Sequence, residues 1–259
     1  MLVDLLLYFI IYSVLGWLCE VGYRSVVEGY VYNSGFLNGP YCPIYGFGAL
    51  LLLTLLAPYT NNAVLLFFAA TILTTLLEGI AGYLLHKCLH ARWWDYSEQP
   101  FNIGGYVCLA FSIVWGLGSV FILRITHPFT ITIASKFSEQ HKLIFVLILL
   151  SVMSVDFIVT IATVMKLNKE LKAIDNLSSQ LHKISDNVAE KVGETAIELD
   201  EKRDKIATEL RKKLKNRREE LLQKRMSRYE RLFKAFPGGS HDQYDNLIKE
   251  LRELYRKKK

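Results

Sequence analysis

The sequence contains none of the short motifs by which common soluble enzymes hold nucleotides or activate nucleophiles. It has no GxxxxGK[ST] phosphate-binding loop, no GxSxG nucleophile elbow, no HExxH zinc motif and no Rossmann glycine fingerprint. These absences exclude a P-loop ATPase within this chain and make ordinary hydrolase or dehydrogenase chemistry a poor explanation for it.

Cysteine is scarce, and its spacing does not indicate a metal site or a disulfide framework. The four cysteines fall in or beside apolar segments, and no two of them form a CxxC pair. We expect them to be reduced, small apolar residues. His86 and His90 could share a helix face, but no third ligand accompanies them, so we predict neither a metal nor another cofactor. The cysteines are Cys19, Cys42, Cys88 and Cys108.

Charge is nearly absent from the first part of the chain and concentrated in the second. Long apolar runs dominate residues 1–166, whereas residues 167–259 have no apolar run longer than two or three residues. The first part therefore reads as an all-α integral membrane domain in contact with the bilayer. The net charge of +6 comes mainly from the extension. Anionic lipid explains that charge beside a membrane domain, so no nucleic-acid partner is expected.

The apolar runs predict a bundle of five transmembrane helices. Four runs exceed the roughly 20 residues that a spanning helix needs. The second has only fifteen, so it is either a short span shielded by its neighbours or a re-entrant segment, and we favour the short span. No basic n-region or small-x-small site marks the first run for cleavage, so it is expected to remain as a span. Lys87–Asn102 and Thr126–His141 are expected to be loops. The predicted spans are Leu2–Tyr23, Pro43–Ala57, Ala63–His86, Ile103–Ile125 and Leu143–Met165.

Helix-breaking residues are almost missing from the extension. Lys166 to Phe236 contains no proline and only one glycine, Gly193, which predicts one long helix. Apolar residues recur in it every eleven positions, a period typical of a straight or slightly right-handed coiled coil. We therefore predict a cytoplasmic coiled coil over 167–236, a homo-oligomer formed through 177–221, and a short amphipathic helix at 241–256. The main apolar row is Leu177, Val188, Leu199, Leu210 and Leu221.

A glycine- and proline-rich stretch interrupts the apolar pattern between the first two predicted spans. Gly35 to Gly48 contains four glycines and two prolines, which disfavours a continuous helix and lacks the alternation of a strand. We interpret the wider segment 33–48 as irregular backbone that forms one wall of a polar site at membrane depth. The broken helices of transporters use backbone groups in this way.

Ionisable residues within or beside the apolar runs are the main candidates for function. Glu20 and Arg24 lie four residues apart and can pair on one helix face, either in a site or as an interfacial anchor. Glu78 lies inside the third run, where an unpartnered charge costs at least about 2.5 kcal/mol, unless it lies close enough to the interface to be wet. Asp156, in the fifth run, ranks below both because its surroundings are rich in Val and Ile.

Further polar residues are expected to join this site from the inner loops. Two tryptophans and a tyrosine at positions 93, 94 and 96 suit an interfacial aromatic belt, but Asp95 and Ser97 are interleaved with them. Such a site could bind a cation, relay protons or hold a polar head group. The predicted binding residues are Glu20, Arg24, Asn38, Tyr45, Glu78, Asp95, Ser97 and Asn102.

Basic residues predict the orientation of the bundle. With five spans, the first and third connections and the segment after the fifth span lie on one side of the membrane. Those segments carry the larger share of Lys and Arg, so this inner side should be the cytoplasm. The C-terminus is then cytoplasmic and the N-terminus outside. The inner basic residues are Arg24, Lys87, Arg92, Lys166, Lys169 and Lys172.

The combination of motifs in the first half of the chain resembles a known family. It is similar to the bacterial family labelled putative ABC-transporter type IV, or CmpB-like, and vertebrate transmembrane protein 229 looks like a relative. The resemblance covers roughly residues 5–125 and implies a permease of the bacterial inner membrane or a plasma membrane. The motifs are Gly16–Glu20, Arg24–Ser25, Gly35–Pro40, Pro43–Gly46, Glu78, Trp93–Ser97, Asn102–Gly105 and Trp115–Gly116.

Three functions are compatible with the sequence, and the first is the leading hypothesis. A membrane transporter or channel would use the polar site as its pathway and, if driven by ATP, would need a separate ATPase subunit. An intramembrane enzyme would use Glu20, Glu78 and Asp95 as acid or base on a lipid head group, with Arg24 holding a phosphate or carboxylate. A scaffold or sensor would work through its coiled coil.

Overall fold

The computed structural model describes most of the membrane-embedded half of the chain and parts of the extension. The described residues are 1–29, 31–191, 208–209, 212–213, 215–216, 229, 231–233, 235–236 and 239–249. The chain divides into two units, and each is considered by itself. The first, here called the membrane domain, comprises Met1–Ala162 and Lys234–Ser240, and the second comprises Thr163–Phe233 and His241–Lys259.

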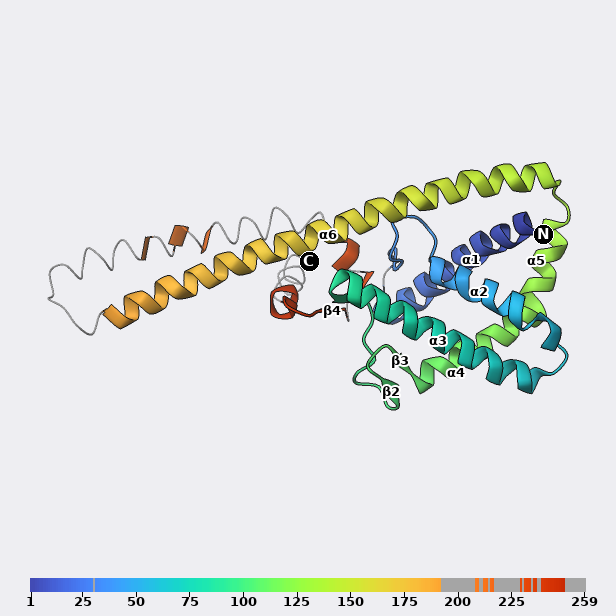
Figure 1. Cartoon of the computed structure of the whole chain (residues 1–259), viewed down its shortest axis with the longest axis horizontal. Helices are drawn as coiled ribbons and strands as arrows, with labels where there is room; N and C mark the ends of the chain where they lie inside the picture. The colour runs from blue at the N-terminus through green and yellow to red at the C-terminus, as the bar shows by residue number, and fades with distance from the viewer. Residues whose placement is uncertain are drawn as a thin grey trace. The chain divides into compact units, whose positions relative to one another are not determined.

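Long helices form nearly all of the membrane domain (Figure 1). Helix α4 continues through a π turn, η2, into α5, and short elements occupy the connections. The long elements are α1 (Leu2–Glu28), α2 (Pro43–Leu55), α3 (Ala63–Leu89), α4 (Leu109–Phe121), η2 (Ile122–Thr126), α5 (His127–Ala134) and α6 (Glu139–Lys191). The short ones are η1 (Ala57–Tyr59), β1 (Ala91–Arg92), β2 (Asn102–Ile103), β3 (Val107–Cys108) and β4 (Ser240–His241).

Among the described residues, four helical segments are long and apolar enough to cross a membrane, which confirms the prediction of a mostly helical membrane domain. They are Leu2–Val27, Ala63–Leu89, Leu109–Ala134 and Glu139–Asn176. The second predicted span, Pro43–Ala57, corresponds to α2, which has only 13 residues, so the predicted count of five spans is not confirmed. At 1.5 Å per residue α2 is about 20 Å long, less than the roughly 30 Å of the hydrocarbon core.

Two predicted boundaries were wrong. The fourth span begins at Leu109 rather than Ile103, because Gly104 and Gly105 have positive φ and turn the chain into a hairpin in which β2 pairs with β3. Most of the predicted loop Thr126–His141 is helical, because the helix continues to Ala134. The π turn shifts the hydrogen-bond pattern next to Pro128, so the helix continues past that proline.

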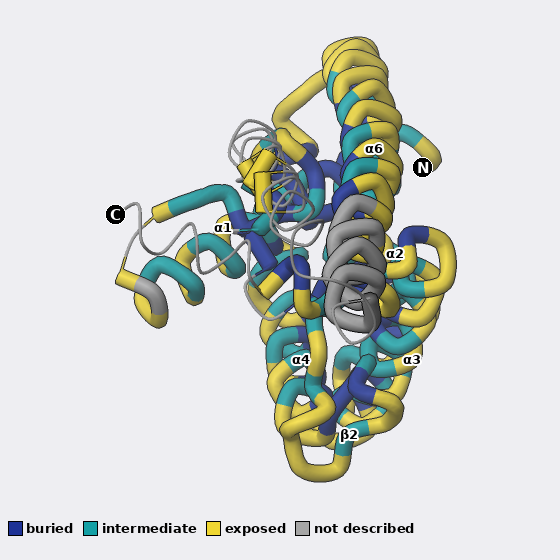
Figure 2. Tube along the Cα trace, turned by 90° about the vertical axis from the view of Figure 1, so that its left-hand side faces the viewer, coloured by how far each residue is buried: buried dark blue, intermediate teal, exposed yellow. Residues whose placement is uncertain are grey.

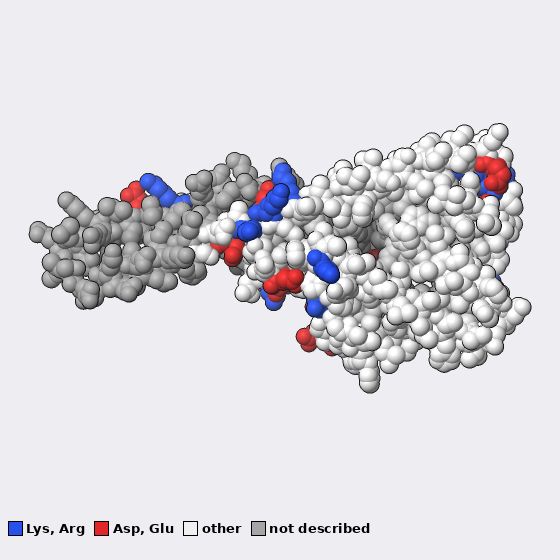
Figure 3. All heavy atoms as spheres, viewed as in Figure 1, with Lys and Arg blue, Asp and Glu red and all other residues white. Residues whose placement is uncertain are grey.

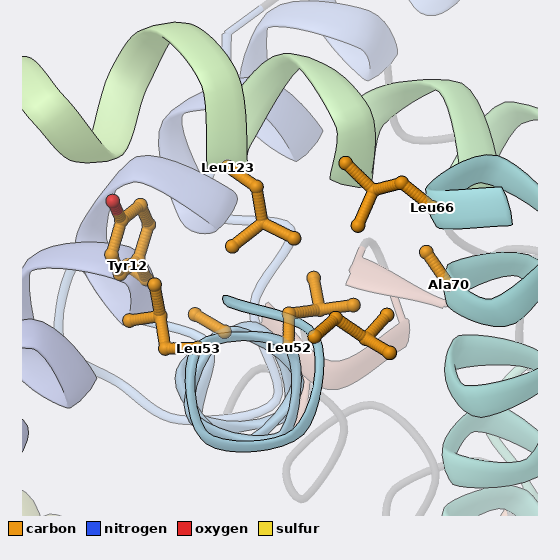
Figure 4. Close-up of a cluster of buried hydrophobic side chains, with 8 residues drawn as sticks. Tyr12, Leu52, Leu53, Leu66, Ala70 and Leu123 are labelled. Carbon is orange, nitrogen blue, oxygen red and sulfur yellow. The ribbon is translucent and has the colours of Figure 1, made fainter. Parts of the chain in front are cut away.

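In the described part of the membrane domain, two clusters of apolar side chains pack between the helices. In the first, Leu52 and Leu53 of α2 pack with Tyr12 of α1, Leu66 of α3 and Leu123 of the π turn (Figure 4). In the second, side chains from α1 and α6 surround residues of the connection between α1 and α2. Its buried members are Leu7, Ile10, Leu37, Tyr41, Ala134, Val146 and Met153.

The outward faces of the helices are apolar and exposed, as a lipid-facing surface requires (Figure 2). On α3 the exposed residues Phe68, Ile72, Leu76 and Ile80 recur every four positions and form one stripe. The visible side of the domain carries few charges between its two ends (Figure 3). An apolar surface of this extent is expected for a multi-pass membrane protein and would make a water-soluble one aggregate.

Helices α1 and α2 approach each other closely at two glycines. A Cβ atom at Gly16 would overlap the ring of Tyr45, and one at Gly46 would overlap the Ser13 hydroxyl and lie 2.6 Å from the Phe9 carbonyl oxygen. Only glycine therefore allows this approach, which brings Tyr45 of α2 beside α1.

The glycine contact gives a testable difference between two positions on the same helix. We expect Gly16→Ala to lower the free energy of unfolding by about 1–3 kcal/mol, because the added methyl group forces the Tyr45 ring away. A Cβ at Gly22 meets nothing within 4 Å, so Gly22→Ala should be neutral or stabilising by about 0.5–1 kcal/mol. Unfolding in detergent measures both variants, and equal effects would contradict the close approach.

The second unit is described only in part. Helix α6 runs without a break to Lys191, and residues 245–249 near the C-terminus are also helical. Tyr229, Leu232 and Leu247 are buried. Most of the predicted eleven-residue row, and residues 250–256 of the predicted terminal helix, lie outside the described residues.

Candidate functional site

Residues 31–42, which we call the crossing loop, penetrate the membrane domain without forming a helix. The Cys42 amide donates a hydrogen bond to the carbonyl of Ser13 at 2.9 Å, and Ser13 lies near the middle of the first span. Leu37 is only 1% exposed and packs in the core with Leu7 and Ile10. The chain between α1 and α3 is therefore discontinuous, because residues 31–42 enter the domain as a loop and helix α2 begins only at Pro43.

Asp156 of α6 supplies acceptors for the crossing loop. Its Oδ1 accepts hydrogen bonds from the Asn38 amide at 3.2 Å and from the Asn38 side chain at 2.7 Å. Its Oδ2 accepts from the Gly39 amide at 2.7 Å and from the Tyr41 hydroxyl at 2.8 Å. Non-helical backbone at membrane depth requires such partners, because lipid provides none.

Asn33 satisfies the rest of the loop from within. Its Oδ1 accepts from the Gly35 amide at 2.9 Å and from the Trp17 indole at 2.8 Å. Its Nδ2 donates to the carbonyls of Leu37 at 3.2 Å and Asn38 at 2.8 Å. Asn33 and Asp156 together replace the hydrogen bonds that a helix would have made.

Glu20 lies on α1 where α2 begins. Its Oε2 accepts a hydrogen bond from the Tyr45 hydroxyl at 3.3 Å and lies 3.8 Å from the Cys42 thiol. Its Oε1 lies 3.7 Å from Nε of Arg24. The predicted pairing of Glu20 with Arg24 is thus present, and Glu20 also contacts the start of α2.

Glu78 is the most deeply buried of the predicted acidic residues, with 8% of its surface exposed. It lies about three turns before the C-terminal end of α3. The Tyr96 hydroxyl donates to Oε1 at 3.1 Å, and the Trp115 indole donates to Oε2 at 3.2 Å. Within the described part of the chain, no Lys, Arg or His nitrogen lies within 4.0 Å of this carboxyl group.

Aromatic rings connect the two carboxyl groups. The rings of Tyr45 and Trp115 meet edge to face with centroids 5.7 Å apart. Because Tyr45 binds Glu20 and Trp115 binds Glu78, this ring contact links the two carboxyl groups. Burial, followed by the charge and hydrogen bond of Glu78, raises the pKa of the Tyr96 hydroxyl well above its usual value, with a smaller contribution from the charge of Glu20. Tyr96 therefore remains a hydrogen-bond donor at neutral pH.

These six residues, which we call the Glu20–Glu78 cluster, have a definite chemical character. Two carboxyl groups and one guanidinium give a net negative site when both acids are ionised, and the remaining polar contacts to Glu78 come from neutral donors. A carboxylate with two neutral donors keeps free lone pairs for a proton or a metal cation. The cluster consists of Glu20, Arg24, Tyr45, Glu78, Tyr96 and Trp115.

Asp95, Ser97 and Asn102, which the sequence placed in the site, bond within the loop between α3 and α4. Asp95 Oδ1 accepts from the Ser97 amide at 2.9 Å and from its hydroxyl at 2.5 Å, and lies 3.6 Å from Arg92. Asn102 donates to the Ser97 carbonyl at 3.1 Å and accepts from the Gly105 amide at 3.1 Å. These contacts shape the loop that presents Tyr96 to Glu78.

The structure thus divides the predicted site into three parts. Glu20, Arg24, Tyr45 and Glu78 meet in the cluster, and the three loop residues support it from outside. Asn38 bonds to Asp156 instead. Among the described residues there is no group of three or more His, Cys, Asp or Glu side chains suited to a metal ion.

Sequence reasoning gave too little weight to four residues. The sequence indicates Tyr96 only as part of an aromatic belt and Trp115 only as part of a family motif, although both bind Glu78. Asn33 is included only as the first residue of the segment 33–48. Asp156 lies near the middle of the fourth spanning segment, and that depth signals an acid with an internal partner.

The fold and the site define a multi-pass membrane protein with an interrupted segment between α1 and α3 and an acidic cluster toward the C-terminal ends of these two helices. The family model described as putative ABC-transporter type IV matches residues 7–161, more than half of the chain, so the chain belongs to that family. The match confirms the resemblance to this family and extends beyond residue 125, whereas the relation to transmembrane protein 229 is not shown by it. No curated protein and no solved structure matched the chain in the comparisons made.

Proposed function

We propose that this chain is the membrane subunit of a transport system and that the Glu20–Glu78 cluster binds a transported or coupling cation, including a proton. The observation that carries the proposal is Glu78, which is 8% exposed and held by two neutral donors. A buried acid with no basic partner among the described residues is costly in a membrane, and a cation removes that cost when it binds.

The discontinuous crossing supports transport rather than a purely structural bundle. In transporters, interrupted helices lie next to the binding site, because irregular backbone is tolerated where it is buried in protein or lines a cavity. Here the start of α2 contacts Glu20 through Cys42 and Tyr45. A shift of α2 along α1 would change the environment of that carboxylate directly.

The orientation of the chain and its energy source can be proposed from the same sequence features. The distribution of basic residues supports an orientation in which the cluster lies in the half of the bundle nearer the cytoplasm and the extension is cytoplasmic. The chain has no phosphate-binding loop, so ATP-driven transport would use a separate ATPase subunit. The eleven-residue row of the extension supports a homo-oligomer.

The direct test is cation binding and flux with the purified full-length chain. Binding of H⁺, Na⁺ and K⁺ is measured by calorimetry in detergent, and flux is measured in liposomes against protein-free vesicles. We expect one cation to bind in competition with protons, because a carboxylate takes either. The absence of binding or flux for all three cations would refute the cation site.

Glu20→Gln should weaken cation binding by only about threefold to tenfold, since Arg24 already offsets much of the Glu20 charge. Glu98→Gln is the matched control, because Glu98 is an exposed acid of the α3–α4 loop. The same calorimetric titration measures both variants. An unchanged affinity in Glu20→Gln would remove Glu20 from the site.

A further inference from the structure

An aromatic column joins the C-terminal part of the chain to the crossing loop. The ring of Trp93 meets Phe36 of the crossing loop edge to face with centroids 4.8 Å apart. Its opposite neighbour is Phe236, also edge to face, at 4.8 Å. Trp93 and Phe236 are each only 8% exposed, so the column is a packed contact within the membrane domain.

The backbone on either side of Phe236 is also closely packed. Ala235 is fully buried, and a Cβ atom at Gly239 would lie 2.7 Å from the carbonyl oxygen of Arg92. The segment Lys234–Ser240 belongs to the membrane domain, whereas the chain before and after it belongs to the second unit. We call its described residues, Ala235, Phe236, Gly239 and Ser240, the strap. One short segment near the C-terminus thus packs against the loop between α3 and α4.

The strap contact contains an unsatisfied group. The buried indole N–H of Trp93 has no hydrogen-bond partner in the described structure. Burying such a donor opposes the apolar packing of the three rings, and the donor regains water when the strap leaves. Trp93 is therefore held in the column by ring packing and can leave it without breaking a hydrogen bond of its own indole, while β4, which contains Ser240, pairs with β1 beside it.

Trp93 links the strap to the part of the crossing loop that leads to Cys42. A Cβ atom at Gly35 would lie 3.2 Å from the Cys42 sulfur, so the thiol packs against the residue next to Phe36. Cys42 is 6% exposed and contacts Glu20. Opening at Phe36 would expose the inner face of the loop beside the Glu20–Glu78 cluster.

We propose that the strap closes the inner side of the crossing loop and that its release opens that side to water. Phe236 packs on Trp93, and Trp93 packs on Phe36, so these two contacts hold the crossing loop in its closed position. Because the strap is flanked on both sides by the second unit, a change in the extension can pull it away from Trp93. This opening would control access of water to the crossing loop whichever cation the protein binds.

Thiol labelling of Cys42 tests the strap in the full-length chain. Cys19→Ser, Cys88→Ser and Cys108→Ala leave Cys42 as the only cysteine, and a water-soluble maleimide is applied to the protein in lipid nanodiscs. We expect Phe236→Ala to accelerate Cys42 labelling about tenfold or more. The control Phe101→Ala removes an aromatic ring that is 80% exposed and should leave the rate unchanged.

A second reporter separates local opening from unfolding. Cys108, which is 1% exposed, is kept as the only cysteine in a parallel chain. We expect its labelling to stay slow in Phe236→Ala, and we expect Gly239→Val to repeat the Cys42 result by displacing the strap backbone from Arg92. Unchanged Cys42 labelling in both variants, or equal acceleration of Cys42 and Cys108, would overturn the strap proposal.

Discussion

Glu78→Gln is expected to lower the affinity of the full-length chain for its cation by about 30-fold or more. The substitution keeps the shape of the side chain but removes the negative charge, and a charged hydrogen-bond or ion contact of this kind is worth about 2 kcal/mol or more. One carbonyl oxygen remains to accept from Tyr96 or Trp115. The fold should therefore survive, with a loss of about 1 kcal/mol in unfolding free energy.

The measurement combines calorimetric cation binding with flux in liposomes and a thermal unfolding scan. Glu98→Gln has the same chemistry at an exposed position of the neighbouring loop and should match the wild type in all three. Trp115→Phe removes one donor to Glu78 while preserving a ring beside Tyr45. It should change affinity by less than Glu78→Gln. Wild-type binding in Glu78→Gln would refute the role given to this carboxylate.

Asp156→Ala is expected to destabilise the membrane domain by about 3 kcal/mol or more. The substitution leaves the amides of Asn38 and Gly39 and the hydroxyl of Tyr41 without an acceptor. Each unsatisfied group costs about 1–3 kcal/mol, and lipid cannot replace the lost partner. The crossing loop should then leave its place between α1 and α6.

Reversible unfolding in mixed detergent micelles measures this loss. Ser154→Ala is the matched control, because Ser154 is exposed on the same helix and bonds only to the Leu150 carbonyl of that helix. Asp156→Asn retains an acceptor oxygen and should fall between the two. A change of less than about 0.5 kcal/mol in Asp156→Ala would show that Asp156 does not hold the crossing loop.

The two variants also separate the site from its scaffold. Glu78 contacts Tyr96 and Trp115, whereas the contacts of Asp156 are with the crossing loop and with Thr160 on its own helix. Glu78→Gln should therefore change cation binding with little effect on stability, and Asp156→Ala should change stability first. If both variants changed only stability, the Glu20–Glu78 cluster would be structural.

The residues that the sequence could assign are those whose behaviour depends on neighbours along the chain. The apolar runs around Leu5, Leu66 and Leu149 predict helices that cross a membrane, because hydropathy over about 20 residues is a local property. The pairing of Glu20 with Arg24 follows from their spacing of four residues on α1. The motifs from Gly16 to Gly116 were likewise sufficient to indicate the family.

Partners far apart in the sequence were decided only by tertiary structure. The spacing of Asp156 does not reveal that it accepts from Asn38, which lies 118 positions earlier. Nor does the sequence reveal that Trp115 binds Glu78 or that Phe236 packs on Trp93. Such contacts depend on how the helices pack and on how closely Gly16 and Gly46 let α2 approach α1.

The stretch from Gly35 to Gly48 shows where the two sources of information meet. Its composition determined that a regular helix would fail there, because glycine and proline weaken helical hydrogen bonding and rigidity. Composition could not determine what the chain does instead. Packing decided that residues 31–42 enter the core as a loop, since Asn33 and Asp156 supply the hydrogen bonds that lipid withholds.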